Sequence, residues 1–248
     1  MLEALDAGID IYLAFVKIFF GNESFRRKAA GDDSLLVQRR SDAKTIILAI
    51  TYGMGIDKMA RNLGVRAQVA RGMRAKCFRR MPSMKELMNE CMRQVARYGY
   101  IDDEVGRRYR VPSALSYKAI NAIIQGLAAQ VMKRALVSCM DTIDMWNSMM
   151  GQTDKFVRAR QILTVHDEIV FEIPVGQEDE LVPLLDSSMI SVMPELSVPL
   201  KADVSWGPFG ASWGDKVDWQ PGDSSRAFAV KKSKAPSGEI AAVVGQIS

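Results

Sequence analysis

The chain has 248 residues, 48% of them hydrophobic, which is enough to bury the core of one large domain or two modest domains. Lysine and arginine total 33 against 29 aspartates and glutamates, and the formal charge of +4 fits a polyanionic partner without requiring one. The three widely spaced cysteines indicate neither disulfides nor a zinc site. The sequence has no apolar run able to span a bilayer and no signal peptide, so we expect a cytoplasmic protein without membrane contacts.

The first hundred residues are predicted to be mostly helical. Residues 1–20 carry apolar side chains at helical spacing and end at Gly21, and residues 21–42 form a basic, partly loop-like connection. A helix-compatible run over residues 41–51 leads into a glycine-bearing segment at 52–55. Three further helices are predicted over residues 56–98, and Gly64 and Pro82 separate them.

The helix predicted over residues 41–51 presents an unusual face. Residues three and four apart lie on one side of a helix, which groups two cations and an apolar surface: Arg40, Lys44, Ile47, Leu48 and Thr51. Such a face suits a polyphosphate bound by the cations, with a base or sugar lying further along the helix. The alternative is a helix whose basic end simply faces solvent.

Residues 99–146 are predicted to form a basic hairpin and then a long helix. The segment 99–112 fits a β-hairpin or loop, and Arg107, Arg108 and Arg110 near its tip can contact a nucleic-acid backbone. Along the helix predicted over residues 119–146, Asn121 and Gln125 are four apart and share a face. Amides so placed can reach base edges or sugars, although exposed amides on helices are usually only solvated.

Residues 161–174 are the most unusual stretch of the chain. Two apolar runs, 162–165 and 169–173, flank His166, Asp167 and Glu168, which predicts a strand, a tight polar turn and a returning strand. His166 is the only histidine and lies beside a carboxylate, an arrangement that suits metal binding or phosphate chemistry. A polar hairpin tip without a function is the alternative.

The remainder of the chain changes character at about residue 214. A helix is predicted over residues 179–193 and a strand over residues 198–204. Trp206, Phe209 and Trp213 lie among glycines and are predicted to close the fold. Residues 215–248 are rich in Ser, Lys, Gly and Pro and are predicted to be a poorly ordered basic tail.

Together these stretches resemble the carboxy-terminal part of family A DNA polymerases, the group that contains bacterial polymerase I and many phage replicative polymerases. Residues 40–44 with 52–53 are similar to motif B on the fingers helix, and residues 165–168 are similar to motif C in the palm. Between them, residues 99–100, 106–108, 121 and 125–126 match further landmarks of the family. The resemblance covers about residues 2–214.

The resemblance implies an α+β fold, in which helical fingers join part of a palm that holds an antiparallel β-hairpin. Residues 1–30 would form a palm-to-fingers helix, residues 31–98 the fingers and residues 99–214 the palm portion with motif C. It also implies a template-directed DNA polymerase, a nucleotidyl transferase of DNA replication that uses Mg²⁺, dNTPs and primer-template DNA.

The resemblance assigns the nucleotide-binding residues by position. Arg40 and Lys44 would bind the phosphates of the dNTP, Lys44 would protonate the leaving pyrophosphate, and Tyr52 would stack near the templating base. Two positions depart from the family pattern. Leu48 stands where the family usually has Phe or Tyr, the side chain that governs discrimination at the sugar 3′ position. Tyr12 stands where a His often contacts the nucleotide phosphates.

The resemblance assigns the palm residues in the same way. Asp167 would be a metal ligand, and His166 and Glu168 would support the primer terminus. The residues implied to touch DNA are Arg107, Arg108, Asn121, Gln125 and Gly53.

One family feature is missing from the chain. Polymerases of this family use two metal ions bridged by carboxylates from two palm motifs. Motif A, an Asp in a short pattern that ends in Glu-Leu-Arg, would lie just upstream of Met1. Glu168 is a poor substitute because neighbouring strand residues point to opposite faces, and Asp203 on the last predicted strand is a weak candidate.

We therefore expect the carboxy-terminal half of a split, phage-type DNA polymerase, whose amino-terminal partner chain carries motif A. The isolated chain is expected to be nearly inactive, and a phage protein would work in the bacterial host cytoplasm. A non-catalytic nucleic-acid-binding remnant of such an enzyme is the alternative. A metal-dependent hydrolase built on the His-Asp-Glu triplet has little support, because the sequence holds no second ligand cluster.

Overall fold

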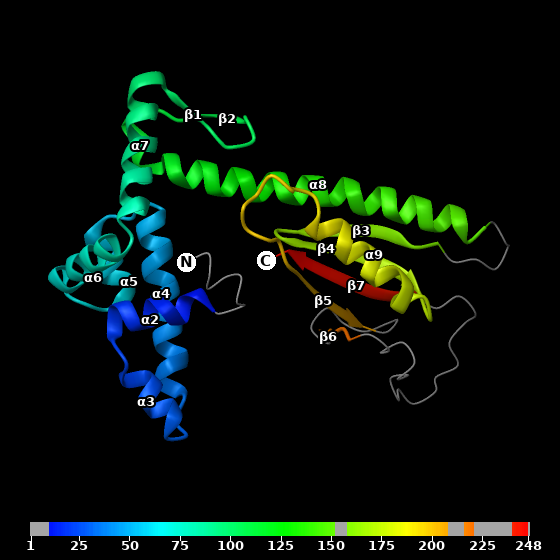
Figure 1. Ribbon diagram of the computed structural model, residues 1–248, viewed down its shortest axis with the longest axis horizontal. Coiled ribbons are helices and arrows are strands. Elements are labelled where there is room, and N and C mark those ends of the chain that lie inside the picture. Colours follow the sequence, from blue (N-terminus) through cyan, green and yellow to red (C-terminus); the bar gives the residue numbers. More distant parts are fainter. Residues whose placement is uncertain (1–9, 152–157, 208–215, 221–239, 248) are drawn as a thin grey trace. The chain divides into compact units, whose positions relative to one another are not determined.

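The computed structural model describes residues 10–151, 158–207, 216–220 and 240–247, the last range by its backbone only. These residues belong to two compact units, Met1–Leu127 and Ala128–Ser248. Helices dominate the first unit, and the second contains a sheet with helices (Figure 1). The fold is α+β, as the sequence predicts.

Six helices precede the first strand in the described part of the first unit: α2 (Ile11–Phe20), α3 (Glu23–Ala29), α4 (Ser34–Thr51), α5 (Ile56–Leu63), α6 (Ala67–Arg80) and α7 (Pro82–Tyr98). The three helices predicted over residues 56–98 are confirmed. Gly64 ends α5 in a left-handed conformation. Pro82 is the first residue of α7, where a backbone N–H has no partner within the helix, so the absence of an N–H in proline costs no hydrogen bond. The helix predicted over residues 1–30 is two helices in its described part, because Gly21 breaks it with a φ of 73°.

The packing of α2 against α4 decides which side of α4 faces solvent. Buried side chains from the two helices share one core: Phe15, Val16 and Phe19 from α2, and Ala43, Ile46, Ala49 and Ile50 from α4. Burial of each large apolar side chain contributes about 1.5–3 kcal/mol, which fixes the rotation of α4 about its axis. Arg40 and Lys44 consequently lie on an exposed face.

A second core joins α7 to a hairpin and to the start of a long helix. Strands β1 (Tyr100–Asp102) and β2 (Arg108–Arg110) pair antiparallel, the 3₁₀ helix η1 (Ser113–Lys118) follows, and α8 (Ala119–Met149) begins directly after it. Cys91, Val95, Ile101 and Ile120 are among the buried residues of this core. The hairpin predicted over residues 99–112 and the long helix after it are both confirmed.

The second unit is a sheet with a helix packed on it. The strands are β3 (Arg160–Val165), β4 (Glu168–Pro174), β5 (Ala202–Gly207), β6 (Val217–Asp218) and β7 (Ile240–Ile247), in the antiparallel order β3-β4-β7-β5-β6. Helix α9 (Glu178–Ile190) buries Leu181, Leu185 and Met189 beside it. The carboxy-terminal half of α8 contacts α9, where the hydroxyls of Thr142 and Ser188 are 2.7 Å apart.

The carboxy-terminal stretch differs from the sequence prediction. The strand predicted over residues 198–204 begins only at Ala202, and residues 240–247 form β7 within what was predicted to be a poorly ordered tail. The apolar run Ile-Ala-Ala-Val-Val fits a central strand, and the polar composition of the surrounding tail hides it. Phe209 and Trp213 lie outside the described residues, whereas Trp206 is buried in β5.

The boundary between the two compact units falls inside α8, after Leu127. The sequence instead divides fingers from palm after residue 98, a functional division that stays a prediction. Among the described helices, none combines the length and the apolar character needed to cross a membrane.

Candidate functional site

The exposed face of α4 brings three predicted site residues together. The guanidinium Cζ of Arg40 lies 5.4 Å from the ring centre of Tyr12, and the ammonium Nζ of Lys44 lies 5.8 Å from the same ring. Both cations are attracted to the electron-rich face of an aromatic ring at this distance. Tyr12 on α2 therefore gathers two positive charges at one place on the surface of the first unit.

Asp10, which the sequence analysis did not single out, also belongs to this group. Its carboxylate accepts a hydrogen bond from the backbone N–H of Tyr12 at 2.8 Å, which caps α2, and another from Nε of Arg40. Burial raises the pKa of Asp10, but the hydrogen bonds from Arg40 and Tyr12 outweigh it and lower the pKa below its ordinary value. A guanidinium has five N–H donors, so Arg40 can keep Asp10 and still bind a phosphate.

The end of α4 depends on a glycine. Gly53 has a φ of 67°, and a Cβ at this position would lie 2.8 Å from the carbonyl oxygen of Tyr117. The tight approach lets the chain turn beside η1 and leaves Tyr52 exposed just after the helix. Gly53 thus shapes the backbone on which Tyr52 sits, and Leu48 lies half-buried one turn earlier.

Gly53→Ala is expected to lower the free energy of unfolding by about 1–3 kcal/mol, because the new methyl group meets a backbone oxygen at a positive φ. Urea denaturation of the full chain measures this. Gly72→Ala is the matched control, since Gly72 lies within α6 with nothing within 4 Å of its added Cβ. There the substitution should be neutral or stabilising, and equal losses in both variants would contradict the role given to Gly53.

The basic hairpin tip is less available for DNA than the sequence suggests. Arg108 donates from Nε and Nη2 to the two carboxylate oxygens of Asp102 at 2.8 and 2.9 Å, and its Cζ lies 3.7 Å from the ring centre of Tyr100. The hydrogen bond from Arg108 lowers the pKa of Asp102. The charge of Arg108 is therefore shared, while Arg107 remains exposed beside the Tyr109 ring.

A buried carboxylate holds the hairpin together, and a glycine of α8 lets the hairpin pack on that helix. Asp103 accepts hydrogen bonds from the N–H of Arg107 at 2.8 Å and from the hydroxyl of Tyr109 at 2.7 Å. A Cβ on Gly126 would lie only 2.2 Å from the ring of Tyr109, so the glycine makes room for this ring. On the same helix, Gln125 is exposed and Asn121 is half-buried, and the buried carbonyl oxygen of Asn121 has no hydrogen-bond partner among the described residues.

In the second unit, the His-Asp-Glu stretch forms the predicted tight turn. Val165 pairs with Glu168, which leaves His166 and Asp167 as the two loop residues, both exposed. His166 has a φ of 56° and is the only non-glycine residue with a positive φ in the described parts of the chain. A left-handed conformation costs an L-residue about 1–2 kcal/mol, and strain of this kind tends to occur at functional sites.

The carboxylates near the turn do not form a metal cage by themselves. Glu168 accepts a hydrogen bond from Nζ of Lys216 at 3.1 Å. Both Glu168 and Asp203 lie opposite Gln246 of β7, so one strand separates them, at roughly 10 Å. Within the described ranges, no group of three or more His, Cys, Asp or Glu could hold a metal ion. Asp167 is exposed at the tip of the turn. Its role as a metal ligand stays a prediction, as does the weaker one for Asp203.

Comparison with known proteins identifies the family. A model of DNA polymerase family A matches residues 1–215. The chain belongs to DNA polymerase family A. The matched range contains the face of α4, the basic hairpin and the His-Asp-Glu turn, which are the stretches that carry the sequence resemblance.

Individual relatives agree with the family assignment. DNA polymerase I of Chloroflexus aurantiacus is 30% identical over 217 residues, which cover 84% of this chain and 21% of that protein. DNA polymerase I of Pseudomonas aeruginosa is 30% identical over 227 residues, which cover 87% of this chain and 22% of that protein. The chain thus spans about a fifth of the length of these family A relatives.

A solved structure shows the same fold. The POL domain of Pol1 from M. smegmatis, in complex with DNA primer-template and dNTP, superimposes with a TM-score of 0.66 at 24% identity. The match covers 80% of this chain and 34% of that chain. The family A fold is therefore present over most of the 248 residues.

Three residues that bind predicted site residues or support their segments are not predicted by the sequence motifs: Asp10 and Asp103 in the first unit, and Lys216 in the second. Asp10 carries a local signal, because an Asp directly before an apolar helix is a typical cap. Asp103 lies in a turn, where a short acceptor commonly binds backbone N–H groups nearby. Lys216 has no such signal, since its partner Glu168 is 48 residues away in the chain.

The positive φ at His166 gives a stability test for the turn. His166→Val is expected to lower the free energy of unfolding by about 1–2 kcal/mol, because a β-branched residue fits poorly at a positive φ. His166→Asn is the control, since Asn tolerates this conformation and should stay within about 0.5 kcal/mol of the wild type. Urea midpoints of the two variants measure the difference, and equal stability of both would show that the turn has another conformation in solution.

Proposed function

We propose that the chain is the carboxy-terminal part of a template-directed DNA polymerase, which transfers nucleotides from dNTPs to a primer 3′ hydroxyl. The cation pair of Arg40 and Lys44 beside Tyr12 carries this proposal. Two cations held on one exposed helix face suit a triphosphate, and family membership favours dNTPs as the ligand. The related M. smegmatis domain in complex with primer-template and dNTP supports it further.

The residues on α4 and directly after it bind different parts of the nucleotide. Arg40 binds the phosphates through its planar fork, and Lys44 binds them as a point charge. Lys44 also donates a proton to the departing pyrophosphate, because an ammonium can give up a proton more readily than a guanidinium. Tyr52 stacks near the templating base, and Leu48 contacts the sugar through an apolar surface alone.

The turn in the second unit acts on the primer. Asp167 would hold one Mg²⁺ ion, and the bound ion would supply activation of the primer hydroxyl and neutralisation of phosphate charge. His166 and Glu168 position the primer terminus. The hydrogen bond from Lys216 fixes the carboxylate of Glu168, which suits a positioning role better than metal binding.

The remaining predicted contacts bind the template and primer. Arg107 is exposed and binds the phosphate backbone. Arg108 contributes less to phosphate binding, because the carboxylate of Asp102 already offsets most of its charge. Asn121 and Gln125 on α8 contact sugars or base edges. Gly53 lets the backbone approach the nascent base pair.

The second metal-binding carboxylate would belong to motif A, a pattern that residues 1–248 do not contain. We assign it to an amino-terminal polymerase chain that carries motif A, because family A membership implies a site with two metal ions bridged by carboxylates from two motifs. The whole polymerase would then be a two-chain, phage-type enzyme of DNA replication.

Reconstitution tests this proposal. The 248-residue chain is mixed with an amino-terminal family A segment that ends in motif A, and primer extension is followed with Mg²⁺ and dNTPs. Synthesis is expected only with both chains, and replacement of the motif A Asp by Asn in the added segment should abolish it. Normal synthesis by the 248-residue chain alone would contradict the split site. DNA binding without synthesis in every combination would identify a non-catalytic remnant instead.

A further inference from the structure

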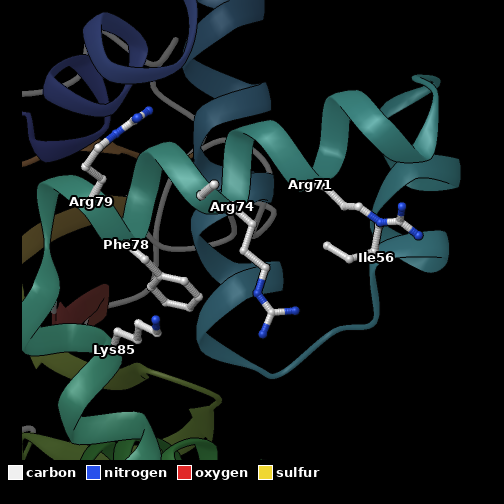
Figure 2. A pocket seen from close by; sticks show the side chains of 7 residues that line it. Ile56, Arg71, Arg74, Phe78, Arg79 and Lys85 are labelled. Atoms are coloured by element: carbon white, nitrogen blue, oxygen red, sulfur yellow. The ribbon is translucent and has the colours of Figure 1, made fainter.

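A basic pocket in the first unit has no place in the polymerase site. Its volume is about 620 Å³, within the range of small-ligand sites. Helix α6 supplies most of its lining, and α5 and α7 supply the rest: Ile56, Arg71, Arg74, Ala75, Phe78, Arg79 and Lys85. Figure 2 shows the side chains of Arg74 and Phe78 next to each other, with Lys85 beyond the ring. None of these residues belongs to the motifs that resemble the family.

The pocket concentrates positive charge without compensation. Four of its lining residues are cations, and none is a carboxylate. Within the part of the chain that the structure describes, none of the four cations forms an ion pair. Arg71 and Arg74 are three residues apart on α6, a spacing at which like charges repel. An anionic ligand would relieve this repulsion.

Phe78 decides which anion fits. Its ring is half-buried and lines the pocket, and the Cζ of Arg74 lies 5.5 Å from the ring centre. Cations that follow a phosphate backbone, combined with an aromatic ring on which a base can stack, are the usual elements of sites for unpaired nucleic acid. A duplex keeps its bases stacked on each other and cannot use the ring. An acidic peptide supplies carboxylates but no base.

We propose that this pocket binds an unpaired DNA strand, with Phe78 stacking a base and Arg71 and Arg74 binding adjacent phosphates. Lys85, beyond the Phe78 ring, extends the positive surface past the stacked base, whereas the side chain of Arg79 points away from the ring (Figure 2). In the proposed polymerase, this strand is template that has not yet been copied. The site is separate from the cation pair on α4, so the first unit binds DNA independently of nucleotide and metal.

Fluorescence anisotropy of the full chain with a labelled 20-nucleotide oligo-dT measures the site without any synthesis. The double variant Arg71→Gln/Arg74→Gln is expected to weaken binding at least about tenfold near 0.1 M salt. Since each phosphate contact on a single strand contributes about 0.7 to the slope of log K against log salt, the slope should become shallower by about 1.4. Phe78→Leu should weaken binding about tenfold with an unchanged slope.

A charge-matched control separates the pocket from net charge. Arg26→Gln/Lys28→Gln removes two exposed cations of α3, which lie outside the pocket, and should leave affinity and slope close to the wild type. Equal losses in the two double variants would overturn the proposal, because binding would then depend on net charge alone. Unchanged affinity in Phe78→Leu would overturn the stacking of a base. Displacement of the oligonucleotide by poly-glutamate at equal charge would assign the pocket to an acidic protein instead.

The result does not depend on the proposed polymerase activity. Oligo-dT binding involves neither dNTP nor Mg²⁺ nor a second chain, so the pocket can bind DNA even if reconstitution yields no synthesis. Thermal unfolding of each variant confirms that a lost affinity is not a lost fold. Arg71 is exposed and Arg74 half-buried, but Phe78 also packs against both hydrophobic cores, so leucine, which keeps an apolar side chain there, is the substitution chosen.

Discussion

Asp167→Asn is expected to lower primer extension by the reconstituted polymerase by roughly a thousandfold or more. Asn has the shape of Asp but not its charge, so it is a weak ligand for Mg²⁺, a hard cation that prefers carboxylate oxygens. Loss of a single group that stabilises transition-state charge commonly costs about 10²–10³ in rate, and loss of a metal ion costs more. Single-turnover extension measures the effect.

The same substitution should leave folding and DNA binding intact. Asp167 is exposed in a two-residue turn, and exposed substitutions usually change stability by less than about 0.5 kcal/mol. Glu180→Gln is the control, since it removes an exposed carboxylate from the first turn of α9 without touching the turn at Asp167. Wild-type synthesis by Asp167→Asn would remove Asp167 from the metal site. Loss of DNA binding together with synthesis would indicate a structural role.

Elements with local signals were predicted from the sequence. Gly64, Pro82 and Gly99 mark the ends of α5, α6 and α7, because each acts on the backbone within a few residues of itself. The His-Asp-Glu turn was found for the same reason, since two apolar β-branched runs flank it. These features need no information from distant parts of the chain.

Features that depend on distant partners were not predicted. Strand β7 lies between β4 and β5, although residues 175–239 separate it from β4 in the chain. Its apolar run is short and lies in a polar tail, so the composition of the whole tail does not indicate a strand. The fit of the Tyr109 ring against Gly126 is of the same kind, because a glycine in a helix gives no sign of what packs against it.

The candidate site shows the same division. The family resemblance predicts roles for Arg40, Lys44 and Asp167, but it does not indicate which opposite charges lie beside the predicted site residues. Asp10 beside Arg40 and Asp102 beside Arg108 both reduce the positive charge that these arginines leave uncompensated. In contrast, the cations of the pocket on α6 lack such partners among the described residues. The number of arginines in a segment is therefore a weaker guide to predicted DNA contacts than whether each arginine already forms an ion pair with a carboxylate.

Lys44→Ala is expected to lower the rate of nucleotide incorporation by about a hundredfold and to weaken dNTP binding. The ammonium lies beside Tyr12 and Arg40, so its removal leaves one cation for the triphosphate. A preorganised charge that meets developing negative charge is worth about 10²–10³ in rate. Lys58→Ala on α5 is the control, because Lys58 is an exposed helix lysine outside this group.

Lys44→Arg separates the two roles proposed for Lys44. Arginine keeps the positive charge and binds phosphates, but its very high pKa makes it a poor proton donor. If Lys44 both binds phosphates and protonates pyrophosphate, Lys44→Arg should recover dNTP affinity and leave the incorporation rate well below that of the wild type. Full recovery of both would limit Lys44 to binding. Recovery of neither would mean that the site beside Tyr12 requires the compact ammonium itself, since a guanidinium there would compete with Arg40 for Asp10.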